Sequence, residues 1–197
     1  MTDNVKTPSA PVLPDMTGSD MVSQVTQYWD GLRCNGGIPA RKDIDARALG
    51  AALPHVFLAE MVTPRVARLR VCGHRVEDLM GMDMRGMPLT TLFAGDARAE
   101  VMSAVGQVAR GVRVTLALQG ETGFGLPRMD ARLALLPLAD AAGQPTRVLG
   151  VLDVSGQIGR SPRRFVRATP LALPVSADAV PPARRAPVLR VINGGRA

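Results

Sequence analysis

One stretch, residues 66–93, constrains the fold of this chain most, because in it a strand pattern passes through a single glycine into a helical pattern. Apolar residues first alternate with polar ones, which is the period of a strand with one apolar and one polar face. They are Ala67, Leu69 and Val71. After Gly73 the spacing becomes that of a short helix, at Val76, Leu79 and Met80. The stretch therefore predicts a strand, a tight turn, a short helix and a methionine-rich loop.

Four further segments have the period of strands, with one long amphipathic helix predicted over residues 97–109. The strands are predicted at residues 56–62, 112–118, 129–136 and 148–154. Short links between the last three favour antiparallel pairing, and helices then gather on one face of the sheet. The sequence thus predicts an α+β fold, with a five-stranded antiparallel sheet, helices on one face and an amphipathic helix ahead of it.

The helix ahead of the sheet begins near Ser19 or Asp20 and carries the only tryptophan of the chain. Its apolar positions keep the helical period. Two interpretations stay open for Val25, Tyr28 and Trp29. They either anchor the helix on its own domain, or form a lid or the contact of a homodimer.

Composition and charge divide the chain into three parts. Residues 1–17 hold three prolines and no periodic pattern, which predicts disorder, and residues 18–158 form the domain. Residues 159–197 hold eight arginines, one acid and many prolines, so they carry the whole net charge of +7. They are predicted to be a mostly disordered tail with a short apolar segment at residues 187–192.

Several segments resemble a bacterial family of single-domain, divergent PAS proteins. They are YWDGLR at residues 28–33, IPARKDID at 38–45, LPHVFL at 53–58 and the stretch 68–86. The resemblance covers about residues 20–157, and the predicted order of strands and helices agrees with it. It implies a PAS-like fold with a sensory or regulatory role, and it implies no reaction.

A ligand pocket is predicted where the short helix meets the methionine-rich loop, since methionine adapts to irregular apolar spaces. The candidate ligand-binding residues are Leu79, Met80, Met84, Leu89 and Leu92. The alternative is a filled core in a chain with only 3% aromatic residues.

Residues for catalysis, metal or cofactor binding are not recognised in the sequence. Cys72 and His74 flank one glycine, but the chain holds only one other cysteine and one other histidine, and their spacing does not fit a zinc site. Flavin-binding PAS domains use an Asn-Cys-Arg motif, which Cys34 and Asn35 reverse, and the long helix lacks a histidine for haem. No enzyme activity, metal or cofactor is expected, and a role for Cys72 and His74 stays open.

The sequence therefore predicts a non-catalytic sensory or regulatory domain that acts in bacterial signalling by protein contact, and by binding a small apolar ligand. The alternative is a protein that binds nucleic acid or an acidic partner through its basic tail. No apolar run approaches the ~20 residues of a membrane span, and the first residues do not form a secretory signal, so a cytoplasmic location is expected.

Overall fold

The computed structural model describes residues 20–33 and 36–168. The predictions for residues 1–17 and 169–197 lie outside the described residues. The helices are α1 (Met21–Gly31), α2 (His74–Met80) and α3 (Ala97–Val108), with short 3₁₀ turns η2 (Arg41–Asp43), η3 (Gly50–His55) and η4 (Leu89–Leu92). The strands are β1 (Val56–Thr63), β2 (Val66–Cys72), β3 (Val114–Gly120), β4 (Met129–Ala139), β5 (Pro145–Gly156) and β6 (Phe165–Arg167).

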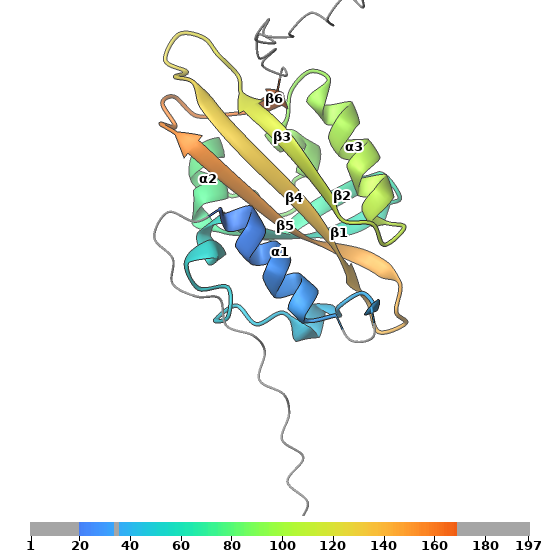
Figure 1. Ribbon diagram of the computed structural model, residues 1–197. Helices are drawn as coiled ribbons and strands as arrows, with labels where there is room; N and C mark the ends of the chain where they lie inside the picture. The colour runs from blue at the N-terminus through green and yellow to red at the C-terminus, as the bar shows by residue number, and fades with distance from the viewer. Residues whose placement is uncertain (1–19, 34–35, 169–197) are drawn as a thin grey trace, which may run out of the picture.

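The strands form one antiparallel sheet in the order β2-β1-β5-β4-β3-β6 (Figure 1). The predicted α+β class and its five strands are confirmed, but the sheet has six strands. The extra strand, β6, pairs with β3 through Phe165 and two following residues. It is only three residues long and lies in the Arg-rich and Pro-rich region, so neither its length nor its composition marks it as a strand.

The inner face of the sheet carries the main core, and α2, η4 and α3 cover it. Leu133 and Leu135 of β4 point to this face, together with Ala67 and Leu69 of β2. The predicted change from strand to helix at Gly73 is confirmed, because β2 ends at the residue before it and α2 begins at the residue after it.

Helix α1 lies on the opposite, outer face of the sheet, across β4 and β5 (Figure 1). The helices predicted to gather on one face, α2 and α3, do so, whereas α1, which was predicted only to precede the sheet, lies on the other face. The physical reason lies in β4 and β5, which are apolar on both faces along part of their length. Ala134, Leu136 and Val151 turn outward, and such a surface must be covered.

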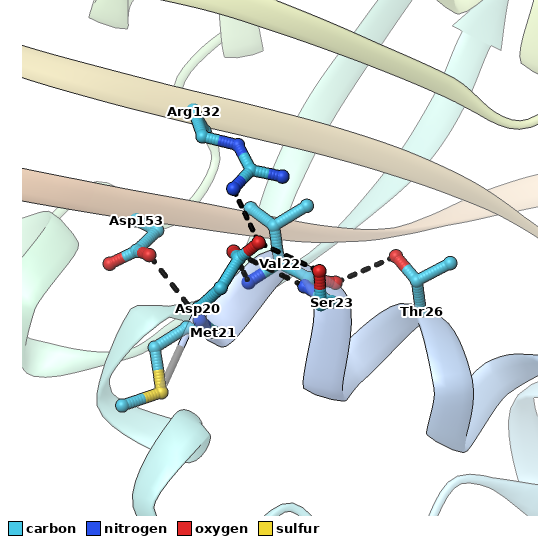
Figure 2. A network of polar contacts seen from close by, with 7 residues as sticks. All are labelled: Asp20, Met21, Val22, Ser23, Thr26, Arg132 and Asp153. Atoms are coloured by element: carbon cyan, nitrogen blue, oxygen red, sulfur yellow. Dashed lines mark hydrogen bonds and ion pairs between the residues drawn. The ribbon is translucent and has the colours of Figure 1, made fainter. Parts of the chain in front are cut away.

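Charged side chains of the outer face hold α1 at both of its ends. Asp20 caps the helix by accepting hydrogen bonds from the backbone N–H groups of Val22 and Ser23 at 3.1 and 3.3 Å. The same carboxylate pairs with Arg132 of β4, and the N–H of Met21 donates to Asp153 of β5 at 3.3 Å (Figure 2).

At the other end of α1, Asp30 pairs with Arg113, which lies just before β3. The mixed charges of this face thus join the helix to the sheet, in addition to the pair between Arg70 and Glu60 of neighbouring strands. No helix in the described parts of the chain is long and apolar enough to cross a membrane.

The segment that leads into β6 also belongs to the folded structure. Arg163 is completely buried, its backbone N–H donates to Leu79 O at 2.7 Å, and its Nη2 donates to Pro127 O at 2.7 Å. Phe165 is buried in the inner core. Four of the eight tail arginines, at positions 160, 163, 164 and 167, therefore lie in the described fold rather than beyond it.

Candidate functional site

A groove of about 630 Å³ lies on the outer face of the sheet, where β1 and β2 meet the segment that contains η2 and η3. Its lining is mainly aliphatic: Ile44, Leu49, Leu53, Val56, Leu58, Val71 and Leu149. Leu49, Val56 and Leu149 are nearly inaccessible to solvent, whereas Leu53 and Val71 are 42% and 53% exposed. The groove thus has a buried apolar floor and an exposed apolar rim.

A β-bulge in β2 supplies one wall of this groove. Leu58 pairs with Val71 and the next residue, Ala59, pairs with Leu69, so Arg70 is an extra residue in β2. The bulge turns Val71 to the outer face and brings Cys72 back to the inner core. The sequence prediction that Val71 shares a face with Leu69 is therefore wrong, since plain alternation holds only up to the extra residue.

Close backbone approach at Gly73 joins this wall to η3. A Cβ atom at Gly73 would lie 2.3 Å from Pro54 O and 2.5 Å from Leu53 O, so only glycine fits there. The N–H of Gly73 also donates to Val56 O at 2.8 Å. The junction between β2 and α2 thus closes against the turn that carries Leu53 and Pro54 in the groove lining.

Helix α1 supports the segment on the other side of the groove through one tyrosine. The hydroxyl of Tyr28 accepts from the N–H of Asp45 at 2.8 Å and donates to Asp43 O at 3.5 Å. Ile44, which lines the groove, lies between these two anchored residues. Burial raises the pKa of Tyr28, so the hydroxyl keeps its proton near neutral pH.

The lining contains basic groups and no carboxylate. Arg41 and His74 line the groove, and the guanidinium of Arg41 has no hydrogen-bond or ion-pair partner among the described residues. Cys72, a free cysteine, borders the groove, although its side chain packs against the inner core. Burial first, and then the charges of Glu77 and Asp83, raise the pKa of Cys72 to about 12, so the thiol is neutral near pH 7. Arg41 is therefore the permanent charge of the groove.

The predicted ligand-binding residues lie elsewhere, in the core on the inner face. Leu79, Met80, Met84, Leu89 and Leu92 are between 0% and 5% exposed and pack together in one cluster. None of them lines the large groove, and Leu79 lines a separate small pocket of about 50 Å³. Their packing agrees with the alternative of a filled core, so a ligand among them stays a prediction that requires this core to open.

The three residues predicted as a homodimer contact are covered within their own chain. Val25, Tyr28 and Trp29 are between 0% and 2% exposed. The indole Nε1–H of Trp29 donates to Pro137 O of β4 at 2.9 Å. The structure thus supports the anchoring interpretation, and a homodimer through these side chains would need α1 to leave the sheet.

Cys72 and His74 are brought to the groove but not to a metal site. The described residues contain no group of three or more histidine, cysteine or acidic side chains placed to hold a metal ion. A thiol with a pKa of about 12 is also a weak nucleophile near neutral pH.

The groove was missed by the sequence analysis, although one signal for it was present. Ile44, Leu53 and Leu58 fall outside the apolar patterns that define the inner core. Apolar residues that remain after a core face has been assigned therefore indicate a second apolar surface.

Comparison with known proteins identifies the family through the sequence. A family model described as "PAS domain" matches residues 18–153. No curated protein matches the chain. Among solved structures, the dark structure of the blue-light photoreceptor Aureochrome1 LOV is 16% identical, has a TM-score of 0.43, and the match covers 56% of this chain and 82% of that chain.

Two other solved structures have similar values. A fungal LOV domain photoreceptor is 20% identical with a TM-score of 0.40, over 69% of this chain and 92% of that chain. An RNA-binding light-oxygen-voltage receptor is 19% identical with a TM-score of 0.41, over 68% of this chain and 43% of that chain. TM-scores this low support no argument about function. The sequence match, which spans most of the described chain, shows that the protein belongs to the PAS domain family.

Proposed function

We propose that this PAS domain is a non-catalytic sensory or regulatory module of bacterial signalling, which binds a small ligand and passes the signal on by protein contact. The observation that carries the proposal is the groove of about 630 Å³, because small-molecule sites typically measure about 300–1,000 Å³ and have mostly apolar walls with few polar groups. The groove matches this description in volume, lining and charge.

The absence of catalysis is part of the proposal and has support in the chemistry of the lining. Its titratable side chains are Arg41, Cys72 and His74. The thiol is held protonated by its raised pKa, and no carboxylate lines the groove to act as a general base beside the imidazole. Binding is the role that these residues serve best.

The path from ligand to partner runs, in this proposal, through α1. The segment that carries Ile44 is fixed to the hydroxyl of Tyr28, and α1 is fixed to β4 through Trp29. A molecule that shifts Ile44 would therefore disturb the contacts of α1 with the sheet. The partner is proposed to be another signalling protein, and the location is proposed to be the cytoplasm.

Native mass spectrometry of the full chain, purified from its own cells, tests the proposal. It is expected to show a bound small molecule, and limited proteolysis of the loaded and stripped protein should differ at the segment around η2 and α1. A protein that carries no molecule under native conditions, and whose proteolysis is unchanged by extracts of its own cells, would contradict the proposal.

Binding to nucleic acid or an acidic partner through the basic tail is the second candidate. It is favoured by the composition of residues 169–197, which contain four arginines, at positions 184, 185, 190 and 196, and only one acidic residue. Replacing these four by glutamine in the full chain should abolish such binding, and affinity in the original chain should fall steeply with salt. Removal of residues 159–197 is unsuitable, because it also removes β6 and the buried Arg163.

A further inference from the structure

We propose that the groove on the outer face binds an amphipathic carboxylate, that is, a small molecule with an apolar chain or ring and one carboxylate group. This inference rests on the proposed function and names the ligand class of the same site. Its basis is the combination of an apolar groove with one cation, Arg41, that has no partner among the described residues.

The walls determine the apolar part of the ligand. Val56, Leu58, Val71 and Leu149 present aliphatic side chains, and Leu53 and Val71 are about half exposed. Covering exposed apolar surface stabilises a complex by about 25 cal/mol for each Å² removed from water. A chain or ring that lies along these side chains gains this stabilisation, whereas a wholly polar molecule does not.

The charge of the lining determines the head group. Arg41 is the only side chain in the lining with a permanent charge, and no acidic residue lines the groove to neutralise it. The pKa of about 12 keeps the Cys72 thiol uncharged, so it does not oppose an anion. Guanidinium presents a planar pair of donors that fits a carboxylate with two hydrogen bonds. A cationic head group would meet repulsion here, and a neutral one would leave Arg41 unpaired.

The shape of the outer face argues against a second copy of the chain as the occupant. A stable protein interface covers about 800 Å² on each partner. On this face α1 covers part of β4 and β5 (Figure 1), and the groove itself is bounded by β1, β2 and the segment that contains η2 and η3. A concave site of about 630 Å³ fits a small molecule better than a folded protein.

Calorimetric titration of the full chain with decanoate, decan-1-ol and decylammonium tests the inference. Decanoate is expected to bind at least about tenfold more tightly than either of the others, as a charge-assisted pair to Arg41 would give. Arg41→Gln should remove this advantage and leave the affinity for decan-1-ol unchanged. Equal affinities for decanoate and decan-1-ol, or no effect of Arg41→Gln, would overturn the inference.

A matched pair of valines locates the site. Val71 and Val62 are each 53% exposed, but only Val71 lines the groove. Val71→Asp should abolish decanoate binding, and Val62→Asp should leave it intact. Should Val71→Asp fail to fold, Leu53→Asp makes the same test on the opposite wall. If decanoate still binds after the substitution in the groove, it binds elsewhere, and the proposed site is wrong.

The outcome of native mass spectrometry separates failure of this inference from failure of the proposed function. A bound molecule without an acidic group, together with weak decanoate binding, overturns the ligand class and leaves the proposed function standing. No bound molecule and no decanoate binding overturn both. Displacement of the native molecule by decanoate from the original chain, but not from Arg41→Gln, supports both.

Discussion

The ring of Phe57 in β1 lies directly against the backbone of Gly150 in β5. The two residues are paired across the strands, and a Cβ atom added at Gly150 would come within 2.0 Å of the Cζ atom of Phe57. The ring is fully buried in the inner core, so a methyl group at position 150 would overlap with it unless the ring moved. The glycine is required by this contact rather than by its backbone conformation.

Gly150→Ala is therefore expected to destabilise the fold by about 3 kcal/mol, the upper range for an overpacked core. Chemical denaturation followed by circular dichroism measures the loss. The double variant with Phe57→Leu should recover a large part of it, because the smaller side chain leaves room for the new methyl group. A single Gly150→Ala variant within about 0.5 kcal/mol of the original chain would contradict the contact.

The contacts of Asp20 predict a pH-dependent contribution to stability. Burial acts to raise the pKa of this carboxyl, but hydrogen bonds from Ser23 and Arg132 outweigh it, so the pKa lies below the ordinary 3.8. The unfolded chain thus takes up the proton first as the pH falls, and the stabilisation present at neutral pH is lost in acid.

Asp20→Ala should cost about 1 kcal/mol at pH 7, through loss of the helix cap and of the pair with Arg132. Asp20→Asn keeps a good cap and should cost only about half as much. The difference between Asn and Asp should shrink as the pH falls through the lowered pKa of the carboxyl, because the protonated side chain no longer carries the charge. Urea titrations at several pH values measure it, and a difference that persists in acid would show that the charge is not its source.

The single tryptophan reports whether α1 stays on the sheet. Trp29 is 2% exposed, so its fluorescence should lie at shorter wavelength than in the urea-unfolded chain and stay constant from low to high protein concentration. A red shift that accompanies dimer formation would instead show that α1 leaves the sheet to pair with a second chain. Trp29→Phe should cost about 1–3 kcal/mol, because the carbonyl of Pro137 loses its donor.

The thiol of Cys72 should react slowly with alkylating reagents. Its pKa is raised from 9.0 to about 12, first by burial and then by Glu77 and Asp83. In a Cys34→Ser chain, which keeps Cys72 as its one thiol, alkylation at pH 8 should be at least about tenfold slower than after unfolding, since the thiolate is the nucleophile. A rate that reaches its plateau near pH 9 would contradict this.

The same shift has a consequence for stability at high pH. Between pH 9.0 and about 12 the unfolded chain releases the thiol proton and the folded chain keeps it, so stability should fall as the pH rises. Cys72→Ala should remove the part of this loss of stability that is due to the thiol.

The buried Arg163 should tolerate substitution by an apolar residue of similar volume. Its side chain is fully buried, and neither Nε nor Nη1 has a partner among the described residues. A buried charge without an anionic partner is costly, so Arg163→Met, which keeps most of the volume, should leave stability unchanged or raise it. Arg163→Ala should cost about 2 kcal/mol through lost packing.

Exposed Arg160 supplies the matched control, since Arg160→Met should change stability by less than about 0.5 kcal/mol. A large loss in Arg163→Met would instead indicate that the guanidinium has an ionic partner in solution.

Periodicity predicted the parts of this fold in which local pattern and tertiary packing agree. The alternation of apolar residues indicated β4, and the spacing after Gly73 indicated α2. β6 could not be predicted, because three residues are too few to show a period. The bulge at Arg70 could not be predicted either, since it depends on pairing with β1.

The candidate site was harder to predict than the fold. Leu79, Met80 and Met84 have the composition of an adaptable pocket, but the same residues fill a core when no space is left between the sheet and its helices. The large groove instead results from contacts between segments far apart in the chain, such as Gly73 with Pro54. Sequence spacing alone carries no information about such an approach.

The extra residue in β2 bears on how this strand can change in length. Arg70 is accommodated at the edge of the sheet, where its side chain pairs with Glu60 at 2.8 Å, and the residues on either side keep their assigned faces. Deletion of Arg70 would thus leave Leu69 and Cys72 on the inner face of the sheet and Val71 on the outer face. An insertion between Val71 and Cys72 would instead turn Cys72 to the outer face. Related sequences that keep the groove should therefore tolerate a difference of one residue in length at position 70, but not at the positions of β2 that follow it.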